Sequence, residues 1–90
     1  MYLHIGNNKN IKMTDIVGIF DTDTATVSKA TKQYLSQAEK RGETISITME
    51  LPKSFILTCC NRKNNVYFSQ LSCKTLCQRA EDIESEIMRR

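Results

Sequence analysis

The chain has no tryptophan, one proline, three glycines and one histidine in 90 residues. With His4 as the only histidine and no glycine-rich phosphate loop, the sequence offers no recognisable catalytic set. No apolar run approaches the roughly 18 residues that span a bilayer. The first ten residues lack the basic and apolar regions of a signal peptide. We therefore expect a cytoplasmic protein that is not an enzyme, uses no cofactor and engages neither a membrane nor a small-molecule substrate.

The composition indicates one folded domain that spans residues 1–90. Hydrophobic residues make up 40% and charged residues 26% of the chain, which argues against disorder. The net charge of +3 is unevenly distributed. Residues 1–80 hold 11 Lys and Arg against 6 Asp and Glu, or +5, whereas residues 81–90 hold 4 acids and 2 arginines, or −2. The body is basic, and the last ten residues form a mostly acidic extension that we expect to be helical.

Hydrophobic periodicity predicts an α+β fold with a small, mostly antiparallel sheet and two helices. The helices are expected at about 24–41 and 72–88. The expected strands are residues 2–5, one or two within 11–21, 44–51, 54–60 and 66–69. The run SFILTCC at 54–60 is continuously apolar, which is typical of a strand at the centre of a sheet. A turn at 61–65 joins it to its antiparallel neighbour.

Three of these segments carry specific expectations. In the first helix, an apolar stripe faces the core, a row of lysines takes the solvent side, and Gly42 ends the helix. The stripe comprises Val27, Ala30, Tyr34, Leu35 and Ala38, and the lysines are Lys29, Lys32 and Lys40. In the second helix the stripe continues to Ile87. In the strand 44–51, alternation places Ile45, Ile47, Met49 and Leu51 on one face. Pro52 then requires an edge or a bend.

All four cysteines lie within residues 58–77, as Cys59, Cys60, Cys73 and Cys77. A zinc site needs ligands two to four residues apart on turns, whereas neighbours on a strand point to opposite faces. A disulfide is disfavoured in a reducing compartment, and a catalytic cysteine would have only His4 as a base. We therefore predict no metal site and interpret the four thiols as packing residues. A redox switch or a zinc-dependent fold is the alternative.

Four stretches resemble a known family: MYLHIGNN, DIVGIFD, PKSFIL and YFSQLSCKTLCQRA. Across about the first 80 residues, in order, they are similar to the RemA/RemB regulators of extracellular matrix genes, and more similar to the RemB branch. The most specific pieces are the N-terminal Met-Tyr-x-His with Gly6, the segment from Asp15 to Asp21, and the block from Ser69 to Ala80. These pieces specify positions in a fold rather than a chemical motif.

The resemblance implies a DNA-binding transcriptional regulator of biofilm matrix genes that assembles into a ring of identical subunits. In the RemA branch a pair of arginines precedes the strand that matches 54–60. Of the corresponding Pro52-Lys53-Ser54, only Lys53 keeps the charge. Another basic position of that branch falls near Asp15, which is acidic here.

We expect this chain to contact double-stranded DNA through phosphates, since it has no helix-turn-helix or zinc-finger signature. The candidate DNA-binding residues are Lys53, Lys9, Lys12, Arg62 and Lys63. One subunit at +3 is a weak ligand, but repeating the same patch in a homo-oligomer raises avidity by roughly 10² to 10⁴. The alternative function is an oligomeric interaction or adaptor protein that modulates a related regulator without binding DNA, and Asp15 favours it.

Overall fold

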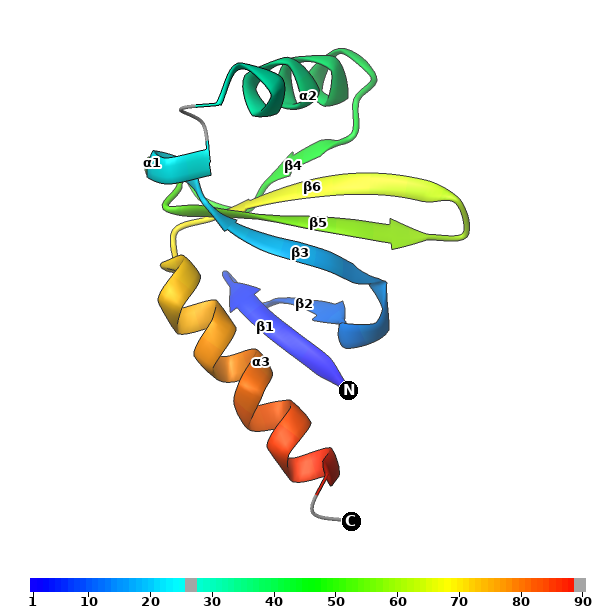
Figure 1. Cartoon of the computed structure of the whole chain (residues 1–90), viewed down its shortest axis with the longest axis vertical. Helices are drawn as coiled ribbons and strands as arrows, with labels where there is room; N and C mark the ends of the chain where they lie inside the picture. The colour runs from blue at the N-terminus through cyan, green and yellow to red at the C-terminus, as the bar shows by residue number, and fades with distance from the viewer. Residues whose placement is uncertain (26–27, 89–90) are drawn as a thin grey trace.

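Short loops join the elements of the fold, so most neighbours in the chain are also neighbours in space (Figure 1). The computed structural model describes residues 1–25 and 28–88, and the side chains of 1–24 and 28–85. In chain order the elements are β1 (Tyr2–Gly6), β2 (Lys9–Lys12), the 3₁₀ turn η1 (Met13–Asp15), β3 (Ile16–Asp21), α1 (Thr22–Ala25), α2 (Lys29–Lys40), β4 (Thr44–Ser46), β5 (Ser54–Cys60), β6 (Lys63–Ser69) and α3 (Cys73–Met88). The predicted α+β class is confirmed.

The central sheet has the strand order β3-β5-β6-β4. β5 pairs antiparallel with β3 and with β6, whereas the short β4 pairs parallel to β6. β1 and β2 form a separate antiparallel hairpin. The prediction of a mostly antiparallel arrangement with 54–60 at its centre is therefore confirmed.

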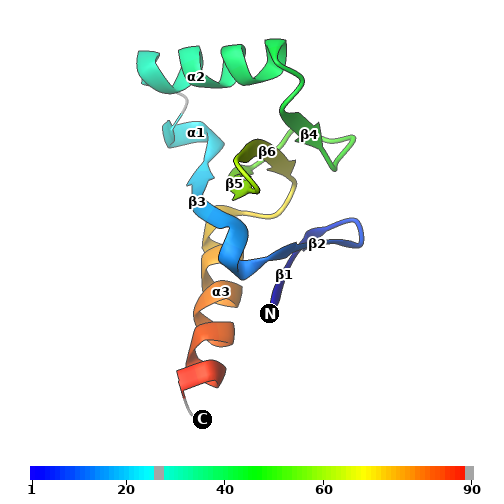
Figure 2. The same ribbon diagram turned by 90° about the vertical axis from the view of Figure 1, so that its right-hand side faces the viewer.

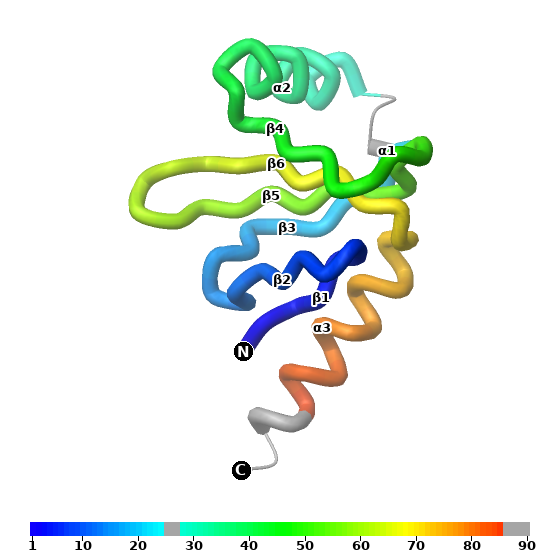
Figure 3. The backbone as a smooth tube through the Cα atoms, turned by 180° about the vertical axis from the view of Figure 1, so that it is seen from behind, coloured from blue at the N-terminus to red at the C-terminus, as the bar shows by residue number. Residues whose placement is uncertain are grey.

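Each face of the central sheet has its own cover (Figure 2). Helix α2 crosses one face, and the β1–β2 hairpin and α3 lie on the other. Because neighbours on a strand point to opposite faces, Phe55 packs beneath Ala38 of α2 while Ile56 packs with Leu3 and Leu76 on the far side. The tube in Figure 3 shows the same arrangement from behind, with the β1–β2 hairpin and α3 side by side beneath the sheet. The chain thus forms three layers with two small cores.

Capping side chains and one left-handed glycine fix the ends of the helices. Asp21 Oδ1 accepts hydrogen bonds from the backbone N–H groups of Asp23 and Thr24, 2.8 and 3.4 Å away, and so caps α1. The hydroxyl of Ser72 accepts one from the N–H of Thr75 at 3.1 Å and caps α3. At the end of α2, Gly42 has φ +71°, which makes it the left-handed residue of a Schellman motif.

Helix α2 starts later than predicted. Asp21 first caps the short helix α1, and α2 then begins at Lys29 rather than near residue 24. Ala38 of the predicted stripe is fully buried, and Leu35 is half-buried. Ala30 and Tyr34 also face the sheet, above Phe55 and Leu57, but both stay exposed, so the expected core stripe is not buried there. Val27 and the side chain of Ile87 lie outside the described residues.

The strand predicted at 44–51 is also shorter than expected. Pairing with β6 covers only Thr44–Ser46, ending at Ser46 opposite Phe68. β6 ends one residue later, so the following segment has no partner strand and leaves the sheet. The prediction that Met49 and Leu51 share an inward face is wrong, because their exposed fractions are 104% and 90%. Pro52 lies in this connection, in keeping with its expected place at a bend.

Two irregularities shape the sheet. The register of β3 against β5 shifts between Ile16 and Gly18, which marks a β-bulge next to this glycine. The turn predicted at 61–65 is confined to Asn61 and Arg62, with φ values of +52° and +66°. Two consecutive left-handed residues are typical of the tight type I′ hairpin turn, so β6 begins already at Lys63.

The molecule is elongated, with extents of 42 × 28 × 24 Å. Figure 1 shows α2 at one end of the longest axis and the last turns of α3 at the other. The N-terminus lies near the β1–β2 hairpin, in the lower half of this view.

Candidate nucleic-acid interface

Lys53 has a fixed backbone and an exposed side chain. Its N–H donates to the carbonyl of Ser69 at 2.9 Å, and its own carbonyl accepts from the N–H of Thr22 at 3.1 Å. These bonds join the residue before β5 to the end of β6 and the start of α1. A cation on a fixed backbone loses little main-chain freedom when it meets a phosphate. Lys53 thus presents its ammonium from a backbone that is held at both its N–H and its carbonyl.

Lys9 and Lys12 begin and end β2 rather than lying in a loop. They are three residues apart on a strand, an odd spacing that turns their side chains to opposite faces. Lys9 is half-buried, and its ammonium lies 5.4 Å from the centre of the Tyr67 ring, in a cation–π contact. Lys12 is exposed, opposite Tyr2. The two lysines therefore do not form one contact surface in a single subunit.

Arg62 and Lys63 extend the basic surface to the tip of the β5–β6 hairpin. Both side chains are exposed, and Lys63 closes the hairpin opposite Cys60. This tip and Lys53 lie at opposite ends of β5, roughly 20 Å apart at about 3.3 Å per residue. The five predicted residues thus occupy four separate places on one copy of the chain, which are Lys53, Lys9, Lys12 and the Arg62–Lys63 tip.

Few of the described cations are neutralised by carboxylates. Among the described residues the one ion pair joins Arg41 to Glu43, with 3.0 Å between Nε and Oε1. The lysines of α2, which are Lys29, Lys32 and Lys40, are exposed, as predicted for the solvent side of that helix. The sequence interpretation of this row as a solvated face is consistent with its exposure, and the row also adds to the positive surface.

The cysteines divide into two pairs with different surroundings. Cys59 and Cys60 are exposed near the hairpin tip, so the expectation that they serve as packing residues is wrong. Cys73 and Cys77 are half-buried on α3, with their sulfurs 3.6 Å apart. Burial, followed by the neighbouring Cys77 thiol, raises the pKa of Cys73 above its usual range. A thiol held in its protonated form is a poor nucleophile.

His4, the one histidine, lies with α3 rather than with a cysteine. Nη1 of Arg79 donates to the His4 carbonyl at 3.1 Å and lies 3.3 Å from Nδ1 of the ring. This contact ties α3 to β1. Among the described residues, no group of three or more Cys, His, Asp or Glu side chains is arranged to hold a metal ion.

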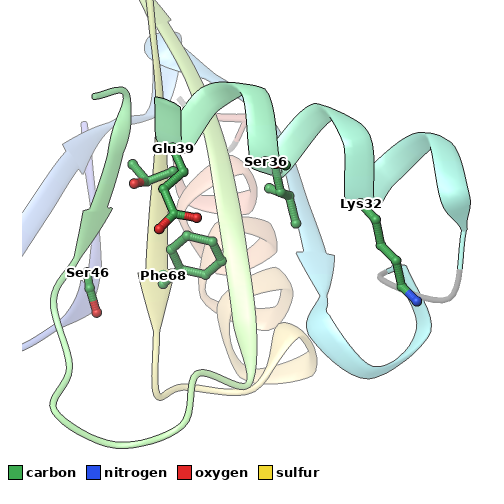
Figure 4. A pocket seen from close by; sticks show the side chains of 7 residues that line it. Lys32, Ser36, Glu39, Ser46 and Phe68 are labelled. Atoms are coloured by element: carbon green, nitrogen blue, oxygen red, sulfur yellow. The ribbon is translucent and has the colours of Figure 1, made fainter. Parts of the chain in front are cut away.

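Two grooves flank α2. One has a volume of about 450 Å³ and lies between the C-terminal half of the helix and the strands β4 and β6. Figure 4 shows Glu39 of α2 beside the ring of Phe68, with Ser36 and Lys32 farther along the helix and Ser46 on β4, so charged and hydroxyl groups share this lining with apolar ones. The second groove, of about 300 Å³, lies under the N-terminal half of α2 and is mainly apolar.

None of the helices in the described part of the chain combines the length and hydrophobicity that a membrane span requires.

Comparison with known proteins finds similarity in sequence to one family and to one characterised member of it. The model of the RemA-like family, described as extracellular matrix regulatory protein A-like, matches residues 2–80. Extracellular matrix regulatory protein B of Bacillus subtilis (strain 168) is 33% identical to the chain over 81 residues. That alignment covers 90% of this chain and 91% of the Bacillus protein.

Proposed function

Because the chain belongs to the RemA-like family of extracellular matrix regulatory proteins, we propose that it regulates matrix genes by binding double-stranded DNA as a homo-oligomer. The observation that supports the proposal most directly is the matrix-regulator relative, which aligns over nine-tenths of both chains. The exposed cations of the folded surface supply the chemistry, since cations that meet phosphates release counterions and so give affinity.

A single copy presents these cations in a dispersed arrangement. Lys53 and the Arg62–Lys63 tip lie at opposite ends of the sheet, and Lys9 is engaged with Tyr67. Assembly changes this, because each copy repeats every cation and several dispersed contacts then act together. We propose Lys53 as the main phosphate contact, with Lys9 and Lys12 contributing from the β1–β2 hairpin and the tip Arg62–Lys63 second.

The test is a DNA-binding titration at several salt concentrations, with the wild type and Lys53→Ala. Lys74→Ala is the matched control, since Lys74 is also an exposed lysine but lies on the first turn of α3. If Lys53 meets a phosphate, its removal weakens binding to all duplexes alike and reduces the slope of log K against log salt by about 0.9 per phosphate lost. The control should leave the slope unchanged.

Two outcomes would contradict the proposal at different levels. Equal affinity and slope for Lys53→Ala and the wild type would remove Lys53 from the interface. Failure of the wild type to bind any duplex at low salt would contradict DNA binding altogether. An oligomer that ignores DNA in sedimentation would favour the adaptor function, which the acidic Asp15 and the exposed apolar Met49 and Leu51 support.

A further inference from the structure

The connection between β4 and β5 holds the most exposed large apolar side chains among the described residues. In this 47–53 loop the exposed fraction is 104% for Met49 and 90% for Leu51. Glu50, between them, is exposed as well. Single exposed apolar residues are common on protein surfaces, whereas neighbouring ones that form an exposed patch are typical of an interaction site.

Hydrogen bonds hold this loop in place at both ends. Ile47 donates its N–H to the Phe68 carbonyl at 3.2 Å, and its carbonyl accepts from the side-chain amide of Asn7. At the other end the hydroxyl of Thr22 donates to the Pro52 carbonyl at 3.0 Å. Met49 and Leu51 are therefore presented to solvent by an ordered backbone, which lowers the entropic cost of docking.

The middle of the loop is also folded on itself. The hydroxyl of Thr48 accepts from the N–H of Glu50 at 3.0 Å, and the Thr48 carbonyl accepts from the hydroxyl of Ser46 at 3.0 Å. This short turn separates Met49 from Leu51 by one residue that carries a negative charge.

The groove under the N-terminal half of α2 has an apolar lining that suits the side chains of Met49 and Leu51. Its floor is Phe55 and Leu57 of β5, its outer wall is Phe20 of β3, and its roof is Ala30 and Tyr34 of α2. Both Phe20 and Tyr34 are 38% exposed. Polar groups on the lining of the other groove make it a poorer site for Met and Leu side chains.

The loop of the same copy does not fill this groove, because Leu51 is almost fully exposed where it stands. A second copy of the chain brings the same loop to the groove from outside. The charges of the two surfaces are complementary. Glu50 on the loop is negative, whereas the exposed Lys29 and Lys32, which flank the roof of the groove on α2, are positive. We propose that the 47–53 loop of one copy docks Met49 and Leu51 into the apolar groove of a neighbouring copy.

This inference rests on the proposed homo-oligomer and specifies how it is built. Loop and groove are different surfaces, so the contact either repeats around a closed ring or is exchanged reciprocally in a dimer. Lys53 is the last residue of the loop, so every such contact places one Lys53 at the junction between two copies.

The experiment uses two variants that each damage one side of the contact. The loop variant carries Met49→Asp and Leu51→Asp, and the groove variant carries Ala30→Asp and Tyr34→Asp. Val17→Asp is the control, since Val17 is 69% exposed on β3 and lines neither surface. Circular dichroism establishes that each variant is folded, and sedimentation velocity and native mass spectrometry measure its size.

We expect the loop and groove variants each to self-associate at least about 100-fold more weakly than the wild type, since an unpaired carboxylate is costly in an apolar contact. An equimolar mixture of the two should form a 1:1 dimer, because one intact loop meets one intact groove. Val17→Asp should keep the wild-type size. If the loop variant unfolds, the milder single change Leu51→Ser replaces it. If the groove variant unfolds, Ala30→Glu replaces it.

Three results would overturn the inference. Folded loop and groove variants that keep the wild-type size would show that another surface joins the copies, with the proposed DNA-binding oligomer intact. Folded monomeric variants that form no mixed dimer would show that the two surfaces do not meet. A monomeric wild type would contradict both the docking contact and the homo-oligomer of the proposed function.

Discussion

Replacing Ser69 by alanine should destabilise the fold strongly for so small a change. Ser69 ends β6 and is fully buried. Its hydroxyl donates to the carbonyl of Ile5 at 2.6 Å and accepts from the N–H of Leu71 at 3.0 Å. The register of β1 against β2 shifts between His4 and Gly6, so Ile5 has no partner residue on β2. The Ser69 hydroxyl therefore donates to a carbonyl at an irregular point of the ladder.

The magnitude follows from the two groups that Ser69→Ala leaves without a partner. A buried donor or acceptor that loses its hydrogen bond costs about 1–3 kcal/mol, and partial relaxation reduces the sum. We expect the free energy of unfolding to fall by about 2–4 kcal/mol. At about 4–8 °C per kcal/mol for a domain of this size, the melting temperature should fall by at least about 8 °C.

The assay is urea denaturation followed by circular dichroism, at one fixed protomer concentration because association adds to apparent stability. Ser36→Ala is the control: Ser36 is exposed on α2, so this change should shift stability by no more than about 0.5 kcal/mol. A loss of unfolding free energy below about 0.5 kcal/mol for Ser69→Ala would refute the reasoning. The hydrogen bonds of Ser69 to Ile5 and Leu71 would then contribute almost nothing to stability.

Further predictions concern the bulge and the thiols. A Cβ at Gly18 would lie 2.7 Å from the ring of Phe20. Gly18→Ala should therefore lower the free energy of unfolding, measured by urea denaturation, by about 1–3 kcal/mol. The loss should be smaller in a Phe20→Ala background, because that change removes the ring. Burial raises the pKa of Cys73, so at pH 8–9 iodoacetamide should label this thiol more slowly than the exposed Cys59. Peptide mass spectrometry measures the two labelling rates, and equal rates would contradict the prediction. Because the raised pKa belongs to the folded state, the stability that Cys73 contributes is present below the pKa of an unfolded thiol and is lost as the pH rises through the folded value.

The elements predicted from the sequence are those whose signals are local. The continuous apolar run of 54–60 requires cover on both faces, and the structure supplies it with α2 on one side and the hairpin and α3 on the other. Gly42 and Ser72 fix helix ends through bonds to residues a few positions away. Such short-range geometry depends little on the rest of the fold.

The predictions that were wrong depended on distant partners. Residues 44–51 alternate as a strand should, but a strand also needs a neighbour, and β6 ends at Ser69. The chain must then turn so that Lys53 meets Ser69 and β5 can begin. This leaves Met49 and Leu51 in solvent, although their pattern is that of core residues.

The candidate interface was predictable in residue type but not in arrangement. Lysines and arginines can be identified directly, yet their distance apart depends on which strand ends meet. Lys9 lies against Tyr67 because the hairpin folds beneath the sheet, a placement that no local signal encodes. Cys59 and Cys60 are exposed because they lie at the far end of β5, near the hairpin tip.

The elongated shape separates charges of opposite sign. Helix α2, with three exposed lysines, lies at one end of the 42 Å axis, and the exposed Glu81, Asp82 and Glu84 lie on α3 toward the other. This separation of charge gives the subunit a dipole along its long axis, on which the field of a polyanion would exert a torque before any contact forms. A copy that diffuses toward a nucleic acid would turn its α2 end forward and its acidic end away. Salt would suppress this alignment as it shortens the Debye length.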